Sequence, residues 1–222
     1  MNSSNSGRKG TQQMSKLQIE TLVLGMVQTN CYLVLNKETK ELLIIDPADE
    51  TARVIQKVGS LEGIPRAILL THGHFDHIGA ARELADRYEI PVCILDEERK
   101  MAEDVRMNAS LLMIGQEISV VADRTFTDGE VAELAGFRIR VIHTPGHTSG
   151  GACYYLEDEK TLFSGDTLFC CSVGRTDLPT GSMGALHTSI HRKLFTLPEE
   201  VCVYPGHGEM TSIGYEKRYN PY

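Results

Sequence analysis

The stretch Thr71–Ala80 reads THGHFDHIGA and places three histidines and one aspartate within six positions. It follows the apolar run RAILL, which predicts a short strand buried on both faces. Behind the stretch, apolar residues recur at helical spacing, so we expect a helix to begin near His77. The cluster therefore lies in a strand-to-helix loop, which is where α/β proteins commonly carry their functional sites.

The four polar side chains of this loop are too polar and too close together to serve as core packing. A single histidine is most often structural or exposed, but four potential ligands in one turn indicate a metal site. In an extended loop three of them occupy alternate positions while the last turns away, so the set can supply two adjacent metal positions. These side chains are His72, His74, Asp76 and His77.

Three later loops place further ligand types behind strands of their own. The segment TPGHT offers His147, SGDTLF offers Asp166 and PGHGE offers His207. Each loop is flanked by glycine, which lets the backbone approach a site closely. Strand ends can thus supply five histidines and two aspartates, and we interpret these histidines as metal ligands.

Composition narrows the class of protein. The 222 residues are 41% hydrophobic and 23% charged, as in soluble globular proteins. A net charge of −8 argues against a nucleic-acid partner. The polar start lacks the apolar core of a secretion signal, and no stretch of about 18 apolar residues follows, so we expect no membrane partner and a cytoplasmic location. Residues 1–15 are expected to form a flexible tail and residues 16–222 a single domain. We expect a small-molecule substrate, and the sequence does not determine the oligomeric state.

The motifs HGHFDH, TPGHT, SGDTLF and YPGHG, in this order, resemble the metallo-β-lactamase fold superfamily from about Asn30 to the end of the chain. The resemblance implies an α/β protein of the αββα sandwich type, in which two mixed β-sheets lie face to face, flanked by helices, with the metals at one edge. It implies two divalent ions, with zinc expected and iron or manganese also compatible with these ligands. It assigns His72, His74 and His147 to the first ion, Asp76, His77 and His207 to the second, and Asp166 to both.

The segment CCSVGRTDLPTGS and the tail YPGHGEMTSIGYEKRYNPY resemble the short, single-domain glyoxalase II-like hydrolases. This implies hydrolysis of a thioester such as S-D-lactoylglutathione or a related 2-hydroxyacyl thioester. Asp76 and Asp166 would act as metal-held catalytic residues around a bridging hydroxide, the nucleophile. A thiol of pKa about 8.5 leaves without a dedicated acid. Full-length hydroxyacylglutathione hydrolases add a C-terminal helical domain that holds glutathione, which we do not expect here.

Other classes stay open beside this interpretation. A mononuclear iron oxidoreductase of the persulfide dioxygenase kind shares the fold and would use His72, His147 and Asp166 as its ligands. A lactonase or lactamase-type hydrolase on the same site is a further alternative. A non-catalytic binding protein has no need for seven intact ligands, and the net charge of −8 disfavours a nuclease.

Several further side chains have competing structural and functional interpretations. His143 is expected to be structural or to support a ligand. His187 and His191 are expected to be partly exposed helix residues, with a place at the mouth of the site as the alternative. Cys170 and Cys171 are expected to be two buried thiols.

The segment GRTD and the C-terminal tail add three charged candidates. Arg175 and Asp177 are expected to form an ion pair that holds their loop, with recognition of a substrate carboxylate by Arg175 as the alternative. Lys217 is expected to anchor the C-terminus rather than to contact substrate.

Overall fold

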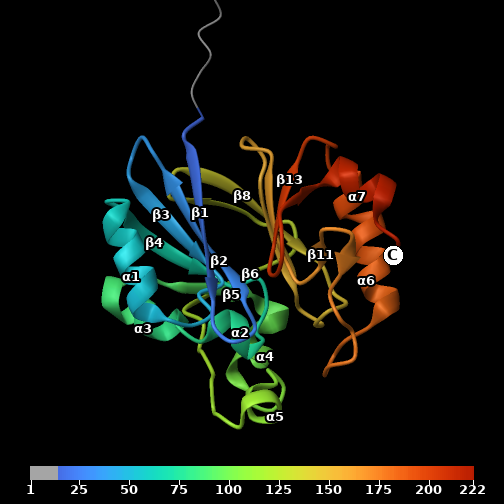
Figure 1. The fold of residues 1–222 in the computed structure, drawn as a ribbon, viewed down its shortest axis with the longest axis horizontal. Coiled ribbons are helices and arrows are strands. Elements are labelled where there is room, and N and C mark those ends of the chain that lie inside the picture. The colour runs from blue at the N-terminus through green and yellow to red at the C-terminus, as the bar shows by residue number, and fades with distance from the viewer. Residues whose placement is uncertain (1–14) are drawn as a thin grey trace, which may run out of the picture.

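The computed structural model describes residues 15–222. Two six-stranded sheets pack face to face and helices cover both outer faces (Figure 1). The expected αββα sandwich is therefore confirmed. The predicted tail over residues 1–15 falls, except for Ser15, outside the described residues.

The first sheet has the strand order β1-β2-β3-β4-β5-β6. Strands β1, β2 and β3 pair in antiparallel fashion, and strands β3, β4, β5 and β6 pair in parallel. Helix α1 connects β3 to β4, helices α2 and α3 connect β4 to β5, and a longer helical excursion precedes β6. The bounds are β1 Leu17–Leu24, β2 Thr29–Asn36, β3 Glu41–Ile45, α1 Thr51–Ser60, β4 Ile64–Leu69, α2 Phe75–Ile78, α3 Ala81–Tyr88, β5 Val92–Leu95, η1 Asp96–Glu98, α4 Arg99–Glu103, α5 Ser110–Ile114 and β6 Arg124–Phe126.

The second sheet has the order β14-β13-β10-β9-β8-β7, and only the β10–β13 pair is parallel. A separate two-stranded hairpin, β11–β12, follows β10. Among the described helices none is long and apolar enough to cross a bilayer. The bounds are β7 Val131–Leu134, β8 Phe137–His143, β9 Ala152–Leu156, β10 Thr161–Gly165, β11 Leu168–Phe169, β12 Ser172–Val173, α6 Met183–Arg192, η2 Leu194–Thr196, β13 Cys202–Pro205, β14 Thr211–Ser212 and α7 Ile213–Tyr219.

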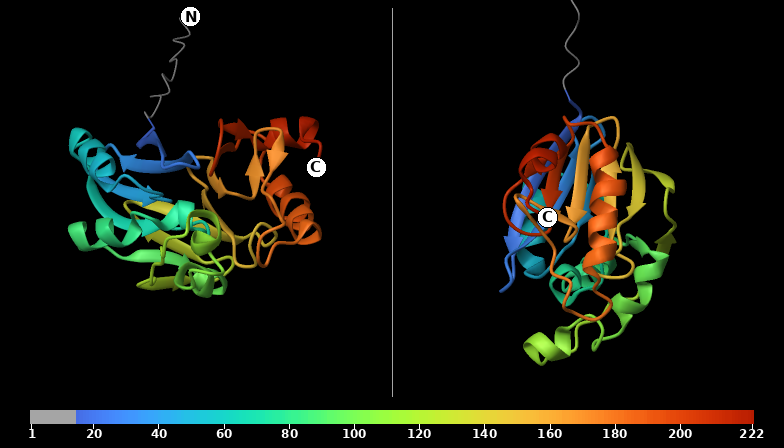
Figure 2. Two further views of the ribbon diagram at one scale, coloured as in Figure 1. Left: turned by 60° about the horizontal axis from the view of Figure 1, so that its bottom comes forward. Right: turned by 90° about the vertical axis from the view of Figure 1, so that its right-hand side faces the viewer.

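Three apolar layers hold the sandwich together. Strand β2 is buried throughout because its alternate residues serve two of these layers. Tyr32 and Val34 pack between the two sheets, whereas Leu33 and Leu35 pack against α1 and α3. A third layer joins the second sheet to α6 and α7. Figure 2 shows α5 projecting away from these layers, beyond one edge of the sandwich.

The helix expected near His77 begins earlier and is interrupted. A single turn, α2, starts at Phe75, and the longer helix α3 starts only at Ala81. Between them Gly79 passes directly over the backbone carbonyl of Ala48, where the Cβ of any other residue would overlap that oxygen. This close approach explains the glycine. The Ala80 amide donates to the Pro47 carbonyl at 2.9 Å instead of to the preceding helical turn, a contact that local apolar spacing did not reveal.

Hydrogen bonds tie the two sheets together where their strands end. The Tyr154 hydroxyl on β9 donates to the carbonyl of Leu70, just after β4, at 2.7 Å. The amide of Ala152 donates to the carbonyl of Thr71 at 2.8 Å, and the amide of Asn30 donates to Gly206 at 2.7 Å. The loop that follows β4 is thus fixed against β9, and the loop that follows β13 is fixed against β2, before any ligand is considered.

We predict that Tyr154→Phe lowers the free energy of unfolding by about 1–3 kcal/mol, because the buried Leu70 carbonyl loses its donor between the sheets. Urea denaturation of the purified protein measures this loss. The matched control is Tyr155→Phe, since the neighbouring Tyr155 hydroxyl makes no hydrogen bond to residues 15–222. Equal stability of wild type and Tyr154→Phe would contradict the prediction.

Candidate metal centre

The seven side chains predicted as ligands meet at one edge of the sandwich. They come from the loops that follow β4, β8, β10 and β13, so four separate strand ends contribute. Four of the five histidines are buried, and the fifth, His207, is partly exposed toward the cavity. Two groups have potential ligand atoms within 4.8 Å of one another, and a third set meets the same limit and links them. The two groups are His72, His74 and His147, and Asp76, His77 and His207; the linking set is His72, His77 and Asp166.

The carboxylate of Asp166 lies between the two groups. Its Oδ2 is 3.5 Å from Nε2 of His147 and 3.6 Å from Nε2 of His207, which belong to different groups. Its Oδ1 is 3.4 Å from Nε2 of His77. A single carboxylate therefore reaches both ligand groups.

The donor atoms fit a pair of divalent metal ions. Nε2 of His77 and Oδ1 of Asp166 are buried and have no hydrogen-bond partner among the described residues. Buried polar atoms normally have such a partner, so two unpaired ones at one site indicate ligand positions. In the other group, Nε2 of His147 lies 2.9 Å from Nδ1 of His74 and 3.2 Å from Nε2 of His72, so three ring nitrogens converge. Imidazole and carboxylate are also the ligand types that zinc, iron and manganese accept.

The pKa values of the histidines shift in opposite directions in the two ligand groups. Burial and the surrounding imidazoles lower the pKa of His72 and bring the pKa of His74 to about 3, so both rings are neutral. Burial also lowers the pKa of His77, but the nearby carboxylates, Asp46 first, raise it above its ordinary value. Burial raises the pKa of Asp166, but His77 and the other histidines hold it below its usual range. Neutral imidazole and ionised carboxylate are the forms that bind metal, so a metal ion at His77 would displace the proton that the carboxylates favour.

The sequence analysis missed a buried carboxylate at the end of β3, Asp46. One of its oxygens accepts from the Thr71 amide at 2.8 Å. The other accepts from the Thr71 hydroxyl at 2.6 Å and from Nδ1 of His77 at 2.9 Å. An ionised carboxylate only accepts, so His77 carries its proton on Nδ1 and directs Nε2 toward Asp166. The signal was present in the strand ELLIID, which ends on this aspartate.

A second missed residue, Glu98, connects two of the ligand loops. It is fully buried, and its two carboxylate oxygens accept from the amides of Gly73 and Gly150, each at 2.9 Å. Gly73 lies between two predicted ligands, and Gly150 lies in the loop that carries His147. Burial raises the pKa of Glu98 to about 7, although the two amides act in the opposite direction. No local motif marked this residue.

The other candidates are placed as follows. Nε2 of His143 contacts the carbonyl of Ser149 at 2.9 Å, so the ring braces the loop that carries His147. The guanidinium of Arg175 donates to both oxygens of Asp177, each at 2.7 Å, as the paired interpretation expects. Beyond that pair, the backbone carbonyl of Arg175 lies 2.7 Å from Nδ1 of His147 and orients the ring.

The remaining candidates lie away from the centre. Lys217 is exposed and faces Glu199, with 3.9 Å between Nζ and Oε1. His187 and His191 stack on the exposed side of α6, with ring centroids 4.1 Å apart, and line a separate depression.

The expectation for the two adjacent cysteines was wrong. Cys170 is half-buried and Cys171 is exposed, because the hairpin β11–β12 turns at these two positions.

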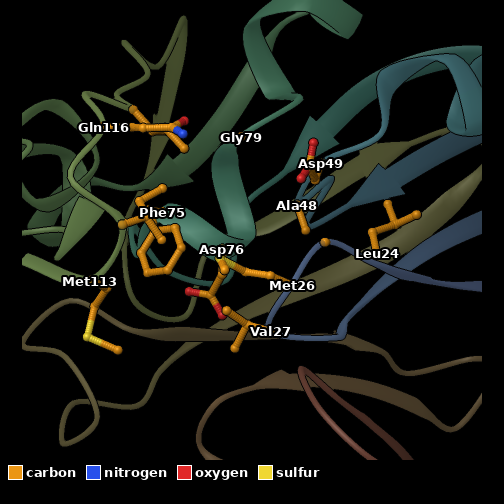
Figure 3. A pocket seen from close by; sticks show the side chains of 13 residues that line it. Leu24, Met26, Val27, Ala48, Asp49, Phe75, Asp76, Gly79, Met113 and Gln116 are labelled. Atoms are coloured by element: carbon orange, nitrogen blue, oxygen red, sulfur yellow. The ribbon is translucent and has the colours of Figure 1, made fainter. Parts of the chain in front are cut away.

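Two cavities meet at the centre. One, of about 360 Å³, is lined by ligand side chains together with Phe75, Phe169 and Arg175. The other, of about 530 Å³, extends beneath α5. Figure 3 shows Asp76 in this second cavity beside Phe75 and Val27, with Met113 approaching from α5. Except for the ligand side chains, the walls near the centre are therefore largely apolar.

We predict that Asp46→Asn weakens binding of one metal ion by about 10–100-fold. The amide cannot accept from His77 at the position of Oδ2, which favours the tautomer with its proton on Nε2, where the metal would bind. Metal analysis after competition with a chelator measures the loss. Asp49→Asn, whose side chain contacts no predicted ligand, is the control. Wild-type retention of both ions would contradict the role of Asp46.

We predict that Glu98→Gln lowers the free energy of unfolding by about 1–3 kcal/mol, because a carboxamide offers one acceptor where two buried amides need one each. Denaturant unfolding of metal-free protein isolates this effect from metal binding. The exposed neighbour provides a matched control, Glu97→Gln, for which no loss is expected. If both variants unfold alike, Glu98 does not connect the two loops.

Comparisons with known proteins identify the family of this chain. Residues 24–207 match the Metallo-beta-lactamase superfamily. The chain is 39% identical over 201 residues to the probable metallo-hydrolase YqgX of Bacillus subtilis, covering 90% of this chain and 94% of that protein. It is 36% identical over 208 residues to the hydroxyacylglutathione hydrolase GloC of Haemophilus influenzae, covering 93% of this chain and 98% of that protein.

Solved structures show the same relationship. The B3 metallo-beta-lactamase BLEG-1 superposes with a TM-score of 0.88 at 41% identity, covering 92% of this chain and 98% of that one. TTHA1623 in a di-iron-bound form gives 0.81 at 37% identity, with 91% and 98% covered. ETHE1 from Myxococcus xanthus gives 0.77 at 31% identity, with 92% and 83% covered. By sequence and fold, this chain belongs to the metallo-beta-lactamase superfamily.

Proposed function

We propose that this protein hydrolyses thioesters, with S-D-lactoylglutathione or a related 2-hydroxyacyl thioester as substrate and two divalent metal ions as cofactors. The observation that carries the proposal is the pair of complete ligand groups joined by Asp166. Such paired metal sites activate water and polarise a carbonyl group together. The similarity to a hydroxyacylglutathione hydrolase supports the choice of substrate class.

The proposed ligand assignment follows the two groups. Zinc is the proposed ion, and the di-iron-bound state of TTHA1623 indicates that a site of this family also accepts iron. Asp76 and Asp166 take part in catalysis as ligands rather than as free bases, because both lie against several histidines. The first ion is held by His72, His74 and His147, the second by Asp76, His77 and His207, and both by Asp166.

When bound, the ions supply Lewis acidity and lower the pKa of a coordinated water toward 7. The protein orients the rings of two predicted ligands. Asp46 holds the proton on Nδ1 of His77, and the Arg175 carbonyl fixes the ring of His147. The apolar walls around Phe75 and Phe169 limit competing water and strengthen electrostatic interactions at the thioester carbonyl.

The cavity also bears on what the site recognises. Arg175 lines it, but Asp177 already occupies the guanidinium with two hydrogen bonds. This ion pair already offsets the positive charge of Arg175, so we do not assign Arg175 to substrate binding. The thiol portion leaves as a thiolate. Its conjugate thiol has a pKa of about 8.5, so the reaction does not need an added general acid.

We predict about two zinc ions per chain and turnover of S-D-lactoylglutathione that falls at least about 100-fold in Asp166→Ala, because the shared ligand of both ions is lost. Elemental analysis and thioester cleavage are measured on the same wild-type and variant samples. Asp158→Ala, an exposed aspartate in the β9–β10 turn, is the control.

Three outcomes would contradict the proposed function. About one iron per chain, with oxygen uptake on glutathione persulfide and no thioester cleavage, would favour a dioxygenase of the persulfide kind. Cleavage of a β-lactam or a lactone but not of the thioester would retain the metal centre and replace the substrate class. Undiminished turnover in Asp166→Ala would remove the centre from the reaction.

A further inference from the structure

Two adjacent thiols form the tip of the hairpin β11–β12. Phe169 pairs with Ser172, so Cys170 and Cys171 are the two residues of the turn. Cys171 has a φ of +53°, in the left-handed region that turns usually give to glycine or asparagine. A cysteine here gains no burial, since Cys171 is exposed and Cys170 only half-buried. The thiols are thus displayed at the surface rather than packed.

A buried carboxylate faces this turn from α7. Glu216 is 1% exposed, and potential ligand atoms of Glu216 and both cysteines lie within 4.8 Å of one another. One carboxylate oxygen accepts from the Cys171 amide at 3.0 Å and from the Asn220 amide group at 2.8 Å. The other accepts from the Thr211 hydroxyl at 2.5 Å. The carboxylate therefore points at the hairpin tip.

All three of these donors are neutral. No lysine, arginine or histidine among residues 15–222 lies within 4.0 Å of the Glu216 carboxylate. A buried carboxylate normally has a counter-charge or coordinates a metal. A cation bound here would supply the counter-charge that these neutral donors lack, beside two thiols whose sulfur atoms lie within 4.8 Å of the carboxylate.

We propose that Cys170, Cys171 and Glu216 form a second metal site that binds a thiophilic divalent cation, Zn²⁺ or Cd²⁺. Binding releases the two thiol protons, and the two thiolates and the carboxylate then coordinate the cation, with solvent completing the shell on the side of Cys171. Thiolate ligands select zinc-like ions over Mg²⁺, Ca²⁺ and Mn²⁺. The site shares no residue with the candidate metal centre, whose ligands are all nitrogen and oxygen.

The position of this site connects it to the cavity wall. Phe169 and Ser172, which flank the two cysteines, both line the 360 Å³ cavity. The Phe169 ring meets the His207 ring edge-on, with centroids 6.1 Å apart. Asn220 also donates to the Ser172 carbonyl at 3.1 Å. A cation held between the hairpin and α7 would therefore tie one wall of the cavity to that helix.

Cadmium titration tests the proposal on metal-loaded protein reduced with a phosphine. Thiolate-to-cadmium charge transfer absorbs in the ultraviolet, whereas cadmium at a histidine and aspartate centre gives no such band. We expect the band to saturate at one equivalent of Cd²⁺ per chain and to disappear when Zn²⁺ competes. Thermal melting of each variant confirms that it is folded.

Three variants separate the ligands from a general effect of thiols. Cys170→Ser/Cys171→Ser should abolish the band and leave thioester turnover in place. Cys202→Ser, a half-buried thiol on β13, should leave the band unchanged. Glu216→Gln should weaken Cd²⁺ binding by about tenfold while retaining the band, because both thiolates remain.

Several results would overturn the site. The proposal fails if wild type shows no charge-transfer band, or if the band persists in Cys170→Ser/Cys171→Ser. It also fails if Cys202→Ser abolishes the band as fully as the double variant does. Unchanged Cd²⁺ affinity in folded Glu216→Gln would remove the carboxylate from the site. None of these results depends on which substrate the metal centre hydrolyses.

Discussion

Five imidazoles and two carboxylates share one small volume at the edge of two sheets, and the rest of the structure accommodates this concentration of polar groups. Burying such groups without partners costs free energy. The fold therefore supplies partners for the nitrogen atoms that face away from the centre, from Asp46 to His77 and from the Arg175 carbonyl to His147. Nε2 of His77 and Oδ1 of Asp166 have no hydrogen-bond partner among the described residues, and they face each other at the common site.

The sandwich makes this arrangement possible because strands from both sheets end at the same edge. Hydrogen bonds such as Tyr154 to Leu70 and Asn30 to Gly206 fix the strand ends across the gap between the sheets. Glu98 then joins two of the ligand loops from outside the sheets. The ligand positions are thus set by backbone contacts and buried carboxylates, consistent with a scaffold that the family shares across different chemistries.

Two segments that supply no predicted ligand, the one with α5 and the hairpin β11–β12, form walls of the two cavities. At the hairpin, two thiols and Glu216 form a sulfur-containing ligand group, whereas the ligand groups of the centre contain only nitrogen and oxygen. Both segments are therefore positioned to contact a molecule that occupies these cavities.

The sequence by itself determined the elements whose signals are local. The spacing in HGHFDH, the buried strand before it and the alternation in FRIRVI predicted a ligand loop and its flanking strands, since a strand or helix period is visible within a few residues. Tertiary structure alone decided the roles of Asp46 and Glu98, whose partners lie 25 or more positions away. It also decided that Cys170 and Cys171 are displayed at a turn rather than buried. Such contacts depend on how layers pack, and no period along the chain records that packing.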